Sequence, residues 1–356
     1  MLQWDEIERQ ALRASDVTEL RGLRDNIHEA FDAARFAEGA VTVDVVNRLH
    51  DALIRTTLAM TEKRVRTSYP GVPPVSSFVV VLFGSGGRKE QTLWSDQDNG
   101  LVYEVAPGAD LVAAERYMAE LGAAFQSDLE AVGYPPCEGK VLVSNPAWRK
   151  SLDGWRATLS EWFERPAFET VRHLLILADA RPIYGDVRLA EALRGELFAR
   201  VAAERETMLP RMLQNTLRYK VLVGVLGNLL TERYGEDAGG IDLKYGAYLP
   251  MVNAIRLLSL GEGAEATSTL ERISALELSG RVSPESARRW SEAFRTILKL
   301  RTMTPYRLEN GIYTTKGILA AKTLTKEVKR ELKDALRVGA SLQRLLKRTF
   351  GTEGHL

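Results

Sequence analysis

The sequence predicts an α+β protein with an N-terminal helical arm, a small mixed-sheet α/β domain and a C-terminal helical bundle. One short, continuous apolar run at residues 78–83 is typical of a buried strand, and a glycine-rich turn follows it. Apolar residues at three- and four-residue spacing, typical of amphipathic helices, dominate the chain before residue 68 and after about residue 148. The expected domains are residues 1–69, 70–185 and 186–356.

The first 68 residues have the apolar spacing of helices, and a break around Glu38-Gly39 predicts two antiparallel helices. The Pro/Gly cluster of residues 69–74 then interrupts the helical pattern. Such clusters mark turns and loops, so we place the first domain boundary here.

The central segment begins with the strand predicted at residues 78–83 and continues with a second strand at residues 96–105. A helix is expected over residues 110–132, with Gly133 as its C-cap. A third short strand is expected at residues 140–143, which completes a small sheet.

Helical segments dominate the C-terminal half, and glycines punctuate them. The predicted helices cover residues 166–180, 187–203, 209–231, 249–260, 267–278, 284–301 and 324–350. The last is basic with interleaved leucines, which indicates an amphipathic bundle helix with a solvated basic face. A basic stripe alone is a weak signal for RNA, so a nucleic-acid partner is not expected.

Composition excludes several classes of protein. Forty-eight basic residues against 47 acidic ones leave a formal charge of +1, so no global field indicates a nucleic-acid or membrane partner. The longest apolar stretch, residues 221–230, is far shorter than the roughly 20 residues that span a bilayer. The N-terminus lacks a secretory signal, and the single Cys137 excludes an internal disulfide. We expect a soluble cytoplasmic protein.

The candidate chemistry lies between the first two predicted strands. A strand that ends in Gly84, Ser85, Gly86 and Gly87 exposes backbone N–H groups that suit phosphate oxygens, especially if a helix starts there. The Ser85 hydroxyl and the Arg88 guanidinium can donate to the same anion. This segment therefore predicts a nucleotide-binding turn.

Asp96 and Asp98 are separated by one residue, so on a strand their carboxylates face the same side. Two negative charges so close are unfavourable unless a cation lies between them. Mg²⁺ is the expected cation, with Mn²⁺ as the alternative, because Mg²⁺ takes oxygen ligands and keeps positions for waters and substrate phosphates. A phosphate cradle followed by such a pair is typical of phosphoryl or nucleotidyl transfer.

Each part of this pattern has a simpler interpretation. A Gly-Ser turn is common, and a lone Asp-x-Asp is more often a solvated loop than a metal site. The conjunction of strand, Gly-Ser, Arg, spacer and Asp-x-Asp favours the chemical interpretation.

The arrangement resembles the polymerase-β nucleotidyltransferase superfamily, whose signature is Gly-Ser, a short spacer often holding an Arg, and Asp-x-Asp. More closely, residues 84–99 resemble the nucleotidyltransferases numbered 294 among domains of unknown function, relatives of the bacterial uridylyltransferase that modifies the PII protein. The similarity continues through residues 133–137, 144–148, 181–186, 242–244 and 269–272 and so covers nearly the whole chain.

The resemblance implies a polymerase-β-like fold in residues 70–185, with Gly84 and Ser85 holding the nucleoside triphosphate. Asp96 and Asp98 would bind the catalytic metal, and Arg88 would be a second-line phosphate contact. The C-terminal bundle would be an acceptor-binding domain, in which Asp242 and Lys244 are candidate acceptor contacts. An ordinary ion pair at a helix start explains Asp242 and Lys244 equally well.

Superfamily enzymes commonly use a third carboxylate on a later strand to activate the attacking hydroxyl. Glu138 is the candidate here, but it precedes the expected strand, so an exposed turn carboxylate is the simpler interpretation. Cys137 has no histidine-centred partner set and is interpreted as a small packed residue.

These observations predict a Mg²⁺-dependent nucleotidyltransferase that moves an NMP group from an NTP to a hydroxyl of a protein or small-molecule acceptor. The alternative is a catalytically weak, nucleotide-binding regulatory module that docks a partner protein. Both predict NTP binding, but only the enzyme predicts metal-dependent release of pyrophosphate.

Overall fold

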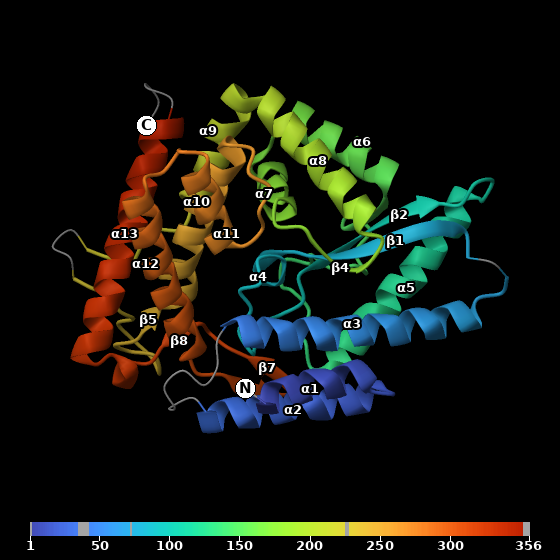
Figure 1. Cartoon of the computed structure of the whole chain (residues 1–356), viewed down its shortest axis with the longest axis horizontal. Coiled ribbons are helices and arrows are strands. Elements are labelled where there is room, and N and C mark those ends of the chain that lie inside the picture. Colours follow the sequence, from blue (N-terminus) through green and yellow to red (C-terminus); the bar gives the residue numbers. More distant parts are fainter. Residues whose placement is uncertain (1, 35–42, 72, 225–227, 352–356) are drawn as a thin grey trace. The chain divides into compact units, whose positions relative to one another are not determined.

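The computed structural model describes residues 2–34, 43–71, 73–224 and 228–351 (Figure 1). The chain divides into two compact units. Unit 1 comprises Met1–Ser160, Asp179–Leu193 and Arg307–Thr314, and unit 2 comprises Glu161–Ala178, Arg194–Tyr306 and Thr315–Leu356. The architecture is α+β, as predicted, with a small mixed sheet and a helical C-terminal half.

Unit 1 is built on a four-stranded sheet in the order β3-β2-β1-β4. Strand β1 is central, and Val79, Val80 and Val81 are completely buried, as expected for a continuous β-branched run. Strand β1 pairs antiparallel with β2 and β4, whereas β2 pairs parallel with β3. The strands are β1 Val75–Leu82, β2 Asn99–Val105, β3 Arg149–Ser151 and β4 Arg181–Gly185.

The strand prediction is confirmed for β1 and is wrong for parts of the rest of the sheet. Residues 140–143 form no strand; the third strand lies later, at β3, and β4 was not predicted at all. The predicted second strand also starts three residues too early. Both new strands are short, so they carry little apolar periodicity of their own, and their pairing with β1 and β2 defines them.

Helices of the N-terminal arm and α5 complete unit 1, and α3 and α5 pack against the sheet (Figure 1). The helices are α1 Leu2–Arg13, α2 Val17–Ala34, α3 Val43–Ser68, α5 Leu111–Val132 and α6 Leu152–Glu164. The prediction for α5 is confirmed: Asp110 caps its N-terminus, and Gly133, at φ 104°, is its C-cap.

The arm contains three helices, not the two predicted. Two bonds mark the start of α2: Glu19 N–H donates to the Asp16 carboxylate at 2.9 Å, and Ser15 N–H donates to the Glu19 carboxylate at 2.8 Å. The predicted break at Glu38-Gly39 lies outside the described residues.

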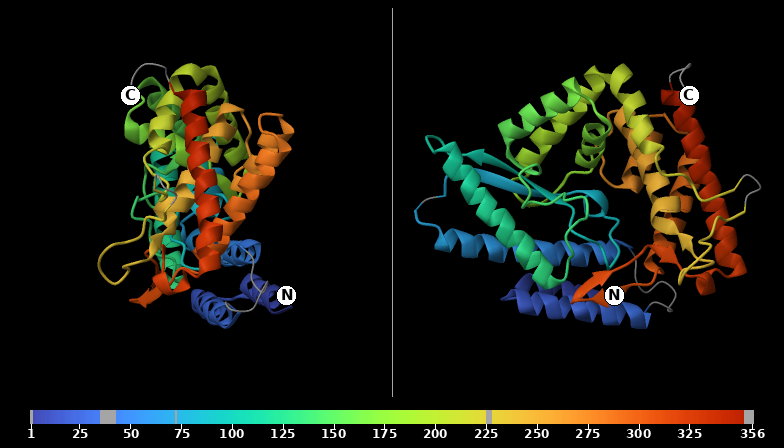
Figure 2. Two further views of the ribbon diagram at one scale, coloured as in Figure 1. Left: turned by 90° about the vertical axis from the view of Figure 1, so that its left-hand side faces the viewer. Right: turned by 180° about the vertical axis from the view of Figure 1, so that it is seen from behind.

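Unit 2 is a helical bundle around α10, of which every residue after the first is buried. Helices α9, α11 and α13 pack on α10, and α12 packs between α11 and α13; α13 is the long red helix in Figure 2. The bounds are α7 Phe168–Leu177, α9 Arg205–Thr216, α10 Leu249–Gly261, α11 Thr269–Leu278, α12 Pro284–Thr302 and α13 Lys326–Phe350. Helix α8 Val187–Ala203 begins in unit 1 and ends in unit 2. Ser268, Ser283 and Thr325 cap the last three helices, which explains their well-predicted starts.

The helix predicted at residues 209–231 is wrong beyond Thr216. The chain instead folds back on itself: Leu222 N–H donates to the Gly246 carbonyl at 2.9 Å, and Gly224 N–H donates to the Asn228 carbonyl at 2.8 Å. A Cβ atom at Gly246 would overlap the Leu222 side chain. Leu222 therefore packs directly on the backbone of Gly246, where there is no side chain. Tertiary packing therefore overrides the local helical pattern.

Short elements complete both units. In unit 2, β5 Ile241–Asp242 pairs with β8 Ile318–Leu319, the π-helical turn Lys244–Tyr248 leads into α10, and a 3₁₀ turn covers Ala321–Thr323. In unit 1, β6 Arg307–Glu309 and β7 Ile312–Thr314 form a hairpin. No helix within the described residues is both long and apolar enough to cross a bilayer.

Candidate active site

Solvent reaches only a few positions in the segment that joins β1 to β2. Between residues 79 and 100, almost every residue is buried. The half-buried exceptions are Gly84, Ser85, Asp96 and Asp98, and only Lys89 is exposed. A ligand that approaches this segment therefore meets the glycine turn and the two carboxylates.

The glycine turn and the carboxylates meet where the two strands join. Phe83 N–H donates to the Asp98 carbonyl at 2.9 Å, directly beyond the last ladder pair. Gly84 then has φ 53°, and a Cβ atom on it would overlap Asp98 Oδ2. Glycine is required here for its backbone conformation and because the carboxylate occupies the space of a side chain.

Asp96 and Asp98 precede β2 but still converge. The residue between them, Gln97, is buried, and its backbone N–H donates to the Pro135 carbonyl at 2.9 Å. That the two carboxylates face the same side stays a prediction, although both residues line one pocket. The Cys137 thiol lies beside both carboxylates: burial raises its pKa, as do a hydrogen bond to Asp98 and the charge of Asp96.

The two carboxylates line a small pocket in unit 1. Its wall combines polar groups of the loop with apolar side chains from α3, β1 and α5. The lining residues are Ile54, Leu82, Gly86, Gln91, Asp96, Gln97, Asp98, Asn99, Leu129 and Tyr134.

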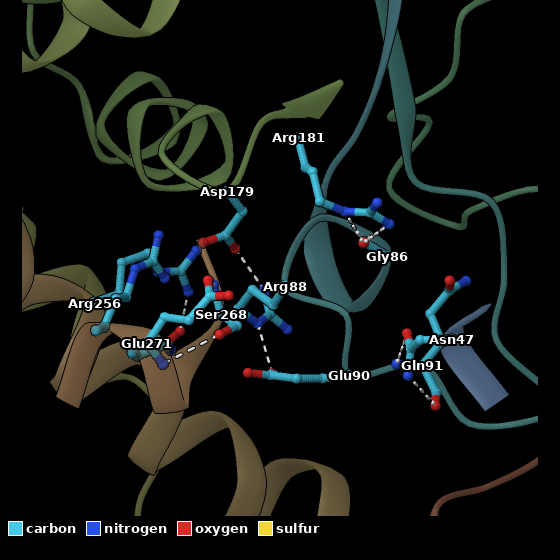
Figure 3. Close-up of polar contacts among 12 residues, drawn as sticks. Asn47, Gly86, Arg88, Glu90, Gln91, Asp179, Arg181, Arg256, Ser268 and Glu271 are labelled. Atoms are coloured by element: carbon cyan, nitrogen blue, oxygen red, sulfur yellow. Dashed lines mark hydrogen bonds and ion pairs between the residues drawn. The ribbon is translucent and has the colours of Figure 1, made fainter. Parts of the chain in front are cut away.

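The glycine turn itself is one helical turn, α4 Gly84–Gly87. Its first bond runs from Gly87 N–H to the Phe83 carbonyl at 2.8 Å, so the preceding N–H groups have no carbonyl four residues back to which they could donate. Gly87 is buried so tightly that a Cβ atom would overlap the Asp179 carbonyl. The Gly86 carbonyl accepts from Arg181 Nη2 at 2.8 Å (Figure 3). Both glycines thus have a packing role, and their contact with a nucleotide stays a prediction.

Arg88 is buried and held by two carboxylates (Figure 3). Its Nε lies 2.9 Å from Glu90 Oε2, and its Nη1 lies 2.5 Å from Asp179 Oδ2. These ion pairs attach the glycine turn to the start of the Asp179–Leu193 segment. The geometry favours a structural role, and the predicted phosphate contact of Arg88 stays a prediction.

Comparison with known families identifies the chain. The model described as "Putative nucleotidyltransferase DUF294" matches residues 26–169, which include the glycine turn and both carboxylates. The model described as "Putative nucleotidyltransferase substrate binding domain" matches residues 206–350. Together they cover most of the chain. The chain belongs to this nucleotidyltransferase family. A search of curated proteins found no match.

Residues of α3 bind the backbone of the loop that joins the glycine turn to Asp96. Gln91 N–H donates to Asn47 Oδ1 at 3.0 Å (Figure 3). His50 Nε2 lies 3.0 Å from the Thr92 carbonyl, and its Nδ1 lies 2.7 Å from the Tyr134 hydroxyl. A carbonyl only accepts, so Nε2 carries the proton and Tyr134 donates to Nδ1. Burial lowers the pKa of His50 to about 3, in agreement with a neutral ring.

The apolar periodicity of residues 43–68 does not predict this support. Its one signal was that Asn47 and His50 are polar residues on the apolar stripe of a predicted helix, where buried polar groups need partners.

The other predicted residues lie apart from the carboxylate pair. Glu138 is in an exposed turn, and within the described residues no three His, Cys, Asp or Glu side chains are placed to hold a metal ion. In unit 2, the Asp242 carboxylate accepts from Tyr245 N–H at 2.9 Å, and Lys244 Nζ lies 5.5 Å from the Tyr245 ring. Asp242 therefore accepts a bond from the backbone of the π-helical turn; a role in acceptor binding stays a prediction.

Substitution Gly84→Ala tests the approach of Asp98 to the glycine turn. The new methyl group is expected to displace the Asp98 carboxylate, and affinity for Mn²⁺ should fall at least about tenfold, the factor for 1.4 kcal/mol. Gly108→Ala is the matched control, because Gly108 has φ 76° and open space around it. Calorimetric titration measures both. Equal Mn²⁺ affinity in the two variants would contradict the proposed contact.

Substitution Arg88→Gln separates a structural role from a phosphate contact. It leaves Glu90 and Asp179 buried without their cation, so the free energy of unfolding should fall by about 3–5 kcal/mol. The control is Arg116→Gln, which breaks an exposed pair with Glu120 and should cost about 0–1 kcal/mol. Urea titration gives both values. A small stability loss together with a large loss of NTP affinity would support the phosphate contact instead.

Proposed function

We propose that this protein transfers an NMP group from an NTP to a hydroxyl of a protein or small-molecule acceptor, with Mg²⁺ bound by Asp96 and Asp98. One observation carries the proposal. Between residues 79 and 100, the positions that are not buried are Gly84 and Ser85 at the start of the glycine turn, Lys89 and the two carboxylates, and Asp98 packs against Gly84. The family match gives the reaction class in general terms.

The carboxylate pair fits a hard divalent cation. Asp96 and Asp98 are half-buried, converge on one thiol and line one pocket, so their negative charges are close to each other. Mg²⁺ is commonly bound by one or two carboxylates, with waters and substrate phosphates as the remaining ligands. A bound Mg²⁺ would supply the positive charge that the phosphates of an NTP need in transfer.

The chain's own groups would orient the triphosphate. The N–H groups of Gly84 and Ser85 begin the turn without partners four residues back, and the Ser85 hydroxyl is half-exposed beside them. Consecutive backbone N–H groups form a concave anion site. Since α4 has only four residues, backbone N–H groups contribute here more than a helix dipole does.

The regulatory alternative is supported by one observation. Glu138 does not join the carboxylate pair in a three-residue set, so a third acid that activates the acceptor is not evident within residues 73–224. The acceptor hydroxyl would then be activated by the metal site itself. Release of pyrophosphate separates the two functions, because a binding module leaves the NTP intact.

The double variant Asp96→Asn with Asp98→Asn tests the proposed metal site. Divalent-cation binding and metal-dependent pyrophosphate release should be lost, with the four NTPs tested in turn and cell lysate as the acceptor source. The melting temperature of the metal-free variant should stay level or rise, because a like-charge pair is relieved.

Glu138→Gln is the control for this variant and should keep both cation binding and pyrophosphate release. A large fall in the melting temperature of the metal-free double variant would show that the carboxylates are structural. Pyrophosphate release that persists in the double variant would remove the proposed reaction centre.

We further propose that unit 2 binds the acceptor through Asp242 and Lys244. The family model that covers this region is described as a substrate binding domain. Both residues are half-buried at a π-helical turn, a feature often found at functional sites. A half-buried carboxylate and a lysine together can orient a polar acceptor group.

Lys244→Ala should impair transfer to the acceptor about tenfold or more, and should leave NTP affinity and cation binding unchanged. Lys329→Ala, which removes an exposed lysine of α13, is the matched control and should behave as the wild type. Radiolabelled NTP transferred to lysate proteins or metabolites measures the difference. Equal transfer by both variants would exclude Lys244 as an acceptor contact.

A further inference from the structure

The β6–β7 hairpin is attached to unit 1 by very little buried surface. Residues 307–314 lie late in the chain but cluster with unit 1. Tyr313 is the single buried residue among them, at 6% exposure. A two-stranded hairpin is at best marginally stable on its own. Docking of this hairpin therefore depends mainly on the contacts of Tyr313.

The hairpin contacts α2 through Tyr313 and through its turn. The Tyr313 ring stacks on the His28 ring, with centroids 3.5 Å apart and planes at 6°. The Tyr313 hydroxyl donates to Asp25 Oδ1 at 2.6 Å. Arg21 Nη1 donates to the Gly311 carbonyl at 2.6 Å and so holds the turn of the hairpin.

The same face of α2 carries Arg24, a buried cation at 1% exposure. Its guanidinium lies 3.4 Å from the centroid of the Tyr134 ring and 5.8 Å from that of Tyr313, so the two aromatic rings are its main stabilising neighbours. Nη2 donates to the Leu93 carbonyl at 3.2 Å, while Nε and Nη1 make no hydrogen bond within the described residues. A cation with two unused donors would move toward water if its cover were removed.

Arg24 and Tyr134 each bind the loop of residues 91–98, which carries Asp96 and Asp98, one on either side of Asp96. Arg24 binds the carbonyl of Leu93, three residues before Asp96. The Tyr134 carbonyl accepts from Gln97 Nε2 at 3.0 Å, one residue after Asp96. Arg24 and Tyr134 are stacked on each other next to the hairpin. The position of the carboxylates thus depends on these two residues.

We propose that the hairpin Arg307–Thr314 is a strap that keeps Asp96 and Asp98 in metal-binding geometry, with Tyr313 and Arg24 as positioning residues. The inference rests on the proposed function only for the role of the carboxylates as metal ligands. The chain enters the strap from Tyr306 and leaves it at Thr315, which both belong to unit 2.

The test is hydrogen exchange on the full chain, combined with Mn²⁺ titration. In Tyr313→Ala, amide exchange of residues 91–98 should accelerate about tenfold or more, the factor for loss of one or two ordinary hydrogen bonds. Exchange at Val79–Val81 and in α10 should not change. Affinity for Mn²⁺ should fall by a similar factor. Leu308→Ala, at a side chain that is 56% exposed on the same hairpin, is the matched control and should match the wild type.

Two further variants keep the test decisive. Tyr313→Phe retains the stacked ring and loses only the bond to Asp25, so its effect should be intermediate and confined to the strap and the loop, even if Tyr313→Ala unfolds the unit. Arg24→Gln should accelerate exchange of residues 91–98 while the strap remains docked.

The proposal is overturned if the strap exchanges faster in Tyr313→Phe and Tyr313→Ala but residues 91–98 exchange as in the wild type. If the variants show the expected exchange rates but the wild type binds no Mn²⁺, the proposed function is contradicted and the proposed role of the strap is not.

Discussion

The close approach of the Asp98 carboxylate to Gly84 is the constraint on which the candidate site depends. It exists because β1 ends at Leu82, Phe83 bonds to the Asp98 backbone, and the next residue has no side chain. Two negative charges close together repel each other. On the proposed function, a divalent cation bound by Asp96 and Asp98 would offset this repulsion.

The positions of Gly84 and Asp98 depend on a rigid support around the loop. Buried polar groups cost free energy unless they are paired, and around this loop they are paired with residues distant in sequence. Asn47 and His50 hold the backbone of Gln91 and Thr92, while Arg88 joins the turn to Asp179. The N-terminal arm, which has no motif of its own, thus serves as the scaffold of the loop that carries the chemistry. Sites held by such secondary contacts keep their geometry without a bound ligand.

The two units have different physical characters. Unit 1 concentrates its buried polar contacts around one loop, whereas unit 2 is organised by an apolar helix, α10, that is buried over nearly its whole length. That division agrees with the two family models, one for the transferase region and one for substrate binding. The hairpin is the exception, since it is a late segment of the chain that packs on the first unit, with Tyr313 as its one buried residue.

By itself, the sequence determined the fold class, the first strand, most helices with Ser, Thr or Asp caps, and a motif specific enough to predict the nucleotidyltransferase family. These features depend on local chemistry: β-branched runs, capping residues and fixed spacing.

Tertiary structure decided the rest. The strands at residues 149–151 and 181–185 exist only as partners of longer strands, and the apolar run after Thr216 is not helical because Leu222 packs on Gly246. Arg88 looks from the motif like a phosphate ligand, but its partner Asp179 is 91 residues away, and Tyr313 is 288 residues from Asp25. No local pattern encodes such pairs, because packing of the whole chain selects them.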